Sequence, residues 1–155
     1  MNVKDYLTER GKPFELLTHP ETSGAQQLAA AVHVPACTVG KTVMLQLDRG
    51  FRYAVAVLPA THVIDFKLLG RMLSGAEAEL VPRDKLHEHC SDCEVGAIPP
   101  FGTRYGMMTL VDESMTVCDE ITFEGNSLSE AIRMKWKDFE DLEHPLVGKF
   151  AVPAE

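Results

Sequence analysis

One segment limits the folds open to this chain more than any other. Residues 53–58 read Y-A-V-A-V-L, with no charged side chain among them. A strand that is apolar on both faces belongs in the middle of a sheet that is covered on both sides. The run before it, residues 38–48, alternates in polarity, and Asp48-Arg49-Gly50 predicts a tight hairpin between the two strands. The two segments therefore predict the centre of a sheet with helices packed against it.

Short helices and further strands are predicted along the rest of the chain. Helices are expected at residues 2–11, after a capping box at residues 23–26, after Asp65, at 82–89 and at 136–142. Other strands are expected at residues 14–17, 78–81, 107–111, 117–123 and 131–135. These elements follow no regular β-α-β order. The predicted fold class is therefore α/β of the mixed α+β kind, a single domain over residues 1–155 with a mixed, mostly antiparallel sheet flanked by helices.

Length, composition and charge exclude several classes of protein. The chain has 155 residues, of which 45% are hydrophobic and 25% charged, as is typical of one globular domain. No apolar run approaches the ~18 residues of a membrane span, and the first residues lack the apolar core of a secretory signal. We therefore expect a cytoplasmic protein without a membrane partner. The net charge of -8 argues against DNA, since broad binding to a phosphate backbone requires many Lys and Arg side chains.

The four cysteines are expected to be reduced thiols, because no secretory signal precedes them. Cys90 and Cys93 form a C-x-x-C pair with His87 and His89 just upstream, which is half of a typical zinc site. No second ligand pair follows at a distance, and no strand precedes the pair as in redox motifs. We predict neither metal nor cofactor. A small metal-binding or redox protein built on Cys90 and Cys93 remains the weakest alternative.

Lys41 is the first candidate site residue. It shares strand parity with Val43, Leu45 and Leu47, so its side chain should lie on the same apolar face of the strand as theirs. A lysine there is uncommon, because an ammonium is rarely buried without a partner. Either the core opens into a cleft at this point, or the side chain lies along the core edge with its charged end in water.

The second candidate is the loop C-E-V-G-A-I-P-P-F-G at residues 93–102. Two prolines fix the backbone and remove two N–H donors. The N–H groups of Gly96, Ala97 and Ile98 could then point at one place, an arrangement that suits a carbonyl oxygen gaining negative charge. The alternative is a rigid turn before the next strand.

Taken together, G-K-T-V at residues 40–43 and G-A-I-P-P-F-G at 96–102 make the chain resemble a known family. It resembles the YbaK and prolyl-tRNA-synthetase-associated domain, the bacterial trans-editing enzymes for mischarged tRNA. H-P-x-T at 19–22, V-L-P-A at 57–60 and V-D-E-S at 111–114 extend the resemblance over most of the chain. Pro99 stands where many relatives have serine.

The resemblance implies hydrolysis of the ester between a wrong amino acid and the tRNA 3′ end. It implies that Lys41 and Gly96 are catalytic, with Lys41 either stabilising developing charge or anchoring the terminal phosphate. The residues expected to bind the substrate are Ala97, Ile98, Pro99, Pro100, Phe101 and Asp112. The expected partners are the acceptor end of aminoacyl-tRNA and an aminoacyl-tRNA synthetase. A non-catalytic module that binds an amino acid or an aminoacyl-nucleotide end, as partner of a synthetase, is the alternative function.

Overall fold

The structure, a computed structural model, describes residues 2–49, 53–94 and 96–154. Its largest sheet has five strands in the order β5 (Ala78–Leu80), β2 (Gly40–Leu47), β3 (Tyr53–Pro59), β6 (Met108–Asp112) and β9 (Leu146–Gly148). β2 runs antiparallel to β5 and β3, whereas β6 runs parallel to β3 and β9. β3 is the middle strand and is buried from residue 54 to 59, which confirms its predicted central place.

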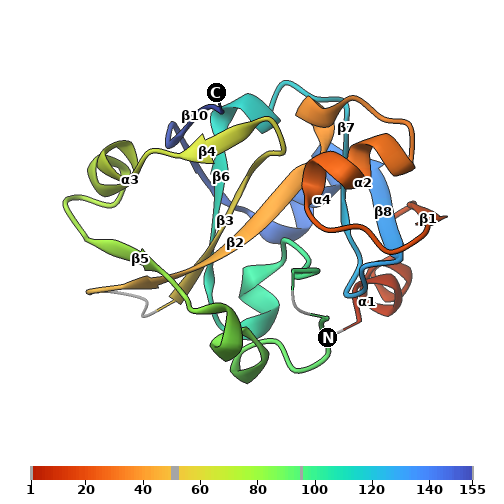
Figure 1. The fold of residues 1–155 in the computed structure, drawn as a ribbon, viewed down its shortest axis with the longest axis horizontal. Helices are drawn as coiled ribbons and strands as arrows, with labels where there is room; N and C mark the ends of the chain where they lie inside the picture. Colours follow the sequence, from red (N-terminus) through yellow and green to blue (C-terminus); the bar gives the residue numbers. More distant parts are fainter. Residues whose placement is uncertain (1, 50–52, 95, 155) are drawn as a thin grey trace.

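A second, antiparallel sheet lies beside the first (Figure 1). Its order is β1 (Glu15–Thr18), β8 (Glu130–Lys135) and β7 (Glu120–Glu124). β7 contacts β2, and an isolated parallel bridge from Val39 to Thr122 joins the two sheets where β2 begins. β4 (His62–Ile64) and β10 (Ala151–Pro153) form a separate two-stranded ladder. The contact between β2 and β7, not the β4–β10 ladder, is the part of the fold that positions the candidate site.

Over residues 2–49, 53–94 and 96–154, four α-helices and four short 3-10 turns complete the fold. The helices are α1 (Val3–Glu9), α2 (Ala25–Ala31), α3 (Phe66–Met72) and α4 (Trp136–Glu143). The 3-10 turns are η1 (Ala36–Thr38), η2 (Arg83–Glu88), η3 (Gly102–Tyr105) and η4 (Glu113–Met115). α3 packs through Leu69 on the cluster that holds Leu45 and Phe150, while α1 and α4 close a second cluster around Phe101. The mixed α/β fold class is therefore confirmed. Within the described residues no helix has the length and apolar character needed to cross a membrane.

Some local predictions were wrong. The helix expected after a capping box begins instead after Gly24, whose φ is 98°, and Ser23 donates to Gln27 Oε1 rather than pairing with Gln26. In place of the α-helix expected at residues 82–89, the structure has the 3-10 turn η2 over Arg83–Glu88. β4, β9 and β10 were not predicted, because each has three residues and too little pattern to detect. The hairpin prediction falls partly on Gly50, which lies outside the described residues.

Candidate active site

A pocket of about 170 Å³ lies where β2, α2, β7 and the proline-containing loop meet. Lys41 and Gly96, the two residues predicted to be catalytic, both line it. Its other lining residues are Gly24, Ala25, Leu28, Gly40, Thr42, Val43, Ile98 and Glu124. The structure thus brings together two sequence segments about fifty residues apart, and it adds an acidic residue that the sequence did not single out.

Lys41 is the second residue of β2 and pairs with Leu58 of β3. Leu45 and Leu47, with the same strand parity, are buried in the cluster beneath α3, and Val43 packs at its edge. The pocket is lined by Lys41 and by its β2 neighbours Gly40, Thr42 and Val43. Burial lowers the pKa of the Lys41 ammonium, and its side chain takes part in no ion pair among the described residues. The ammonium is therefore available to an anionic ligand.

Gly96 lines the pocket in a backbone conformation that favours glycine. Its φ is 89°, and an added Cβ would meet nothing closer than Leu128 Cδ2 at 3.9 Å, so backbone conformation rather than space requires glycine here. The N–H groups of Gly96 and Ile98 have no acceptor among the described residues. The N–H of Ala97 instead donates to the carbonyl of Glu94 at 3.0 Å, so two N–H groups, not the predicted three, are left for a ligand.

In the loop, Ala97, Pro99 and Pro100 are buried and lie outside the pocket lining. Phe101 has no exposed surface, and its ring centroid lies 5.2 Å from that of Phe139 in the core. These four residues were predicted to bind substrate, and none of them lines this pocket. Ile98 is the one predicted substrate-binding residue that lines the pocket.

Asp112 also lies away from this pocket. It ends β6, is 2% exposed and borders a separate, larger cavity of about 520 Å³. Its Oδ1 accepts the N–H groups of Phe150 and Ala151, each at 2.9 Å, and its Oδ2 accepts from Ser114. Burial alone would raise the pKa of Asp112, but these hydrogen bonds lower it below its usual range. Asp112 therefore fastens the C-terminal segment to β6, and we leave it out of the proposed site.

Replacing Asp112 with alanine is expected to lower the free energy of unfolding by about 2–5 kcal/mol, because two buried N–H groups lose their acceptor. A carboxyl with a lowered folded pKa stabilises above its unfolded pKa, and this contribution disappears as the pH falls through the folded pKa. The deficit of Asp112→Ala should therefore shrink below about pH 4. Urea unfolding of wild type and Asp112→Ala at pH 7 and pH 3.5 measures the difference in the free energy of unfolding. Asp119→Ala, at an exposed position, is the control. A loss below about 1 kcal/mol at pH 7 would contradict this role.

Glu124 was not predicted from the sequence. It is the last residue of β7 and is 8% exposed, and its Oε2 is buried with no hydrogen-bond partner in the part of the chain that the structure describes. Burial raises the pKa of Glu124 to about 7, and the nearby carboxylate of Glu94 adds to the effect. The sequence feature that could have indicated Glu124 is its position directly after a strand segment with the apolar residues Ile121 and Phe123. The predicted strand ended at residue 123, so Glu124 was not considered.

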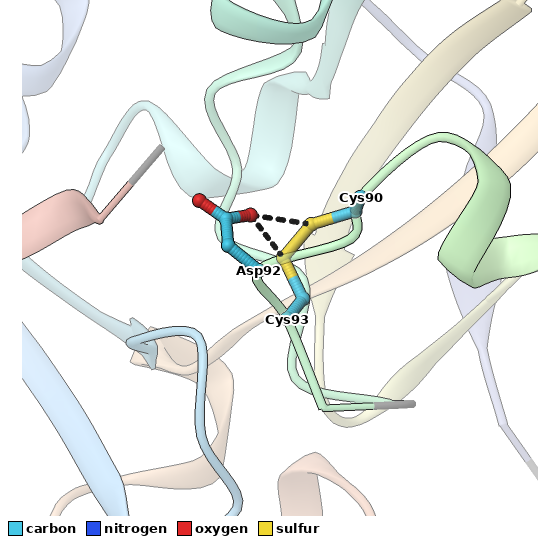
Figure 2. A group of neighbouring side chains, drawn as sticks. All are labelled: Cys90, Asp92 and Cys93. Atoms are coloured by element: carbon cyan, nitrogen blue, oxygen red, sulfur yellow. Dashed lines mark hydrogen bonds between the residues drawn. A yellow bond between two sulfur atoms is a disulfide. The ribbon is translucent and has the colours of Figure 1, made fainter.

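Cys90 and Cys93 form a disulfide just before the loop, with their Cα atoms 5.5 Å apart (Figure 2). The expectation that all cysteines are reduced was therefore wrong for this pair, whose Cα separation lies in the normal disulfide range. Cys37 and Cys118 are free. Asp92 Oδ1 lies 3.5 Å from Cys90 Sγ and 3.6 Å from Cys93 Sγ. These three residues are the one group of potential metal ligands found among the described residues, and neither upstream histidine joins it. The two cysteines could bind a metal only after reduction of the disulfide, because the thiolate is the ligand.

Comparison with known proteins gives the class of this protein. The sequence matches the family described as the aminoacyl-tRNA editing domain over residues 19–142. A solved structure described as hypothetical protein APE2540 is 17% identical, with a TM-score of 0.86, over 97% of this chain and 99% of that one. Another, described as a proposed trans-editing enzyme for prolyl tRNA synthetase, is 19% identical, with a TM-score of 0.84, over 97% of this chain and 94% of that one. No curated protein matches the chain.

The family match covers most of the chain, including Lys41, the loop and Glu124. The chain belongs to the aminoacyl-tRNA editing domain family. The likeness to the two solved structures shows that it has their fold.

Proposed function

We propose that the protein is a trans-acting deacylase that hydrolyses the ester of mischarged aminoacyl-tRNA. The observation that supports this is the pocket that Lys41 shares with Gly96 and Ile98, whose N–H groups have no acceptor in the described part of the chain. Family membership supports the same activity. Its partners would be the acceptor end of aminoacyl-tRNA and an aminoacyl-tRNA synthetase, for which the neighbour described as acting for prolyl tRNA synthetase is the support. Such a protein would act in the cytoplasm.

The reaction asks little of an enzyme beyond positioning and charge stabilisation. Water adds to the ester carbonyl, an oxyanion forms, and the bond to the ribose oxygen then breaks. Holding the ester and the water in line supplies ~7 kcal/mol or more, and one well-placed oxyanion donor supplies roughly 3 kcal/mol. In our proposal the N–H groups of Gly96 and Ile98 donate to the oxyanion. Lys41 either adds to this stabilisation or binds the phosphate of the terminal nucleotide.

The pocket walls favour a small aminoacyl group. Gly24, Ala25, Leu28 and Val43 give it small, apolar sides, and its volume is about 170 Å³. The net charge of -8 is compatible with a protein that holds only the 3′ end, since few phosphate contacts are then needed. The affinity for tRNA should accordingly depend only weakly on salt concentration. A steep salt dependence would contradict this mode of binding.

Gly96→Ala is expected to lower kcat/KM about tenfold or more, because alanine disfavours the positive φ that presents the N–H. Gly106→Ala is the matched control. Its φ is 72°, an added Cβ there would meet nothing within 4 Å, and it does not line the pocket. Both variants should lose about 1 kcal/mol of stability, whereas Gly106→Ala keeps wild-type activity. Equal activity of the two variants would remove Gly96 from the site.

Incubation with a panel of mischarged tRNAs tests the function as a whole. We expect at least one small aminoacyl-tRNA to lose its amino acid faster with the protein than in buffer. If no member of the panel is hydrolysed but the aminoacyl end still binds, the non-catalytic binding module is the correct function. Stoichiometric metal in protein purified without chelator would instead support a role for Cys90 and Cys93.

A further inference from the structure

Glu124 is a charged residue of the pocket that the proposed chemistry does not use. It is 8% exposed, lines the pocket with Lys41 and Gly96, and has one buried carboxylate oxygen without a hydrogen-bond partner among the described residues. A buried acceptor without a donor is unfavourable in a folded protein. At the wall of a pocket, such an atom indicates a ligand that brings the missing donor.

The charges of the pocket indicate which ligand this is. Glu124 is the only acid and Lys41 the only base among the described residues that line it, and neither belongs to an ion pair of the described chain. A ligand that matches both must carry a cationic group close to an anionic one. An aminoacyl ester has this character, since its α-ammonium lies one carbon from the carbonyl that becomes the oxyanion.

We propose that the Glu124 carboxylate binds the α-ammonium group of the aminoacyl ester, an inference that rests on the proposed deacylase function. An ammonium has three N–H donors and can satisfy the buried Oε2. Glu124 then holds the nitrogen, the N–H groups of Gly96 and Ile98 face the carbonyl, and the apolar walls hold the side chain. Glu124 is thus a residue that selects for a free amino group. N-acylated ends, such as that of peptidyl-tRNA, are rejected because they carry no ammonium.

The electrostatics of the empty pocket agree with this assignment. Burial raises the pKa of Glu124 to about 7, and the carboxylate of Glu94 adds to the effect. A bound ammonium would favour the ionised carboxylate. A carboxyl with this pKa could also act as a general base toward the attacking water. The two roles predict different substrate dependences, and the experiment separates them.

The experiment compares one small aminoacyl-tRNA with the same tRNA after N-acetylation of its amino acid. Wild-type protein should prefer the free amine in kcat/KM by about 10- to 100-fold, the effect of a charge-assisted hydrogen bond. Glu124→Gln should abolish this preference by slowing the free-amine substrate alone. Glu94→Gln is the matched control, removing a nearby charge outside the pocket lining, and should keep the preference. An unchanged preference in Glu124→Gln, or an equal loss on both substrates, overturns the proposal.

A binding measurement keeps the assignment testable without turnover. The probes are 3′-alanylamino-3′-deoxyadenosine, which cannot be hydrolysed as an ester, and its N-acetyl derivative, titrated by calorimetry. Wild-type protein should bind the free amine about tenfold tighter or more, and Glu124→Gln should bind the two alike. This difference without tRNA hydrolysis would support the ammonium site and contradict the deacylase. Hydrolysis with equal or undetectable binding of both probes would contradict the ammonium site alone.

Discussion

Lys41→Ala is expected to lower kcat/KM for the best mischarged tRNA by about 100-fold. This is the usual effect of removing one group that stabilises an oxyanion. The variant should fold normally, because Lys41 makes no ion pair among the described residues and burial lowers the pKa of its ammonium. Single-turnover deacylation gives the rate, and urea unfolding followed by the fluorescence of the buried Trp136 gives the stability. Exposed Lys67→Ala, outside the pocket lining, should leave the rate unchanged.

The same kinetics decide between the two roles of Lys41. If its ammonium stabilises the oxyanion, Lys41→Ala lowers kcat and leaves KM nearly unchanged, since the interaction exists only in the transition state. If it binds a phosphate of the terminal nucleotide, KM rises and kcat is kept. Full activity of Lys41→Ala, with Lys67→Ala equally active, would show that the pocket around Lys41 is not the active site.

The sequence predicted the features that depend on local pattern. The apolar run at residues 53–58 identified the central strand, and the parity of Lys41 with Val43 and Leu45 indicated a lysine on the apolar face. Asp65 was expected to cap a helix, and its side chain accepts the N–H groups of Lys67 and Leu68 at the start of α3. In each case the residues that decide the structure are neighbours in the chain.

Features that depend on distant packing were not predicted. Glu124 reaches the pocket because β7 contacts β2, a junction that also contains the bridge from Val39 to Thr122. β10 follows Phe150, whose N–H is held by the Asp112 carboxylate across 38 residues of sequence. The N–H of Ala97 is taken up by a local turn to Glu94, but the proline pattern alone does not show which N–H groups remain free. The position of Glu124, the attachment of β10 and the acceptor of the Ala97 N–H become visible only in the folded chain.

Glu124→Gln is expected to make the protein more stable at pH 8 while weakening its use of aminoacyl-tRNA. The pKa of Glu124 is raised to about 7, so the folded protein holds this proton more tightly than the unfolded chain. A carboxyl of this kind stabilises the fold at low pH, and the contribution disappears as the pH rises from about 4.5 to about 7. Glutamine has a similar shape and no charge, so the variant should be about 2–3 kcal/mol more stable than wild type at pH 8 and nearly equal at pH 4.

Urea unfolding at pH 4, 6 and 8 measures this difference directly. Glu94→Gln should give a smaller gain at pH 8, because it removes only a secondary cause of the raised pKa of Glu124. Exposed Glu113→Gln should show no such dependence on pH. A variant that gains stability but loses its preference for a free amino group would show that the buried charge is kept for binding, as expected where function opposes stability. Equal stability of Glu124→Gln and wild type at pH 8 would instead show that the carboxylate is already solvated or paired, and the reason to assign it a ligand would disappear.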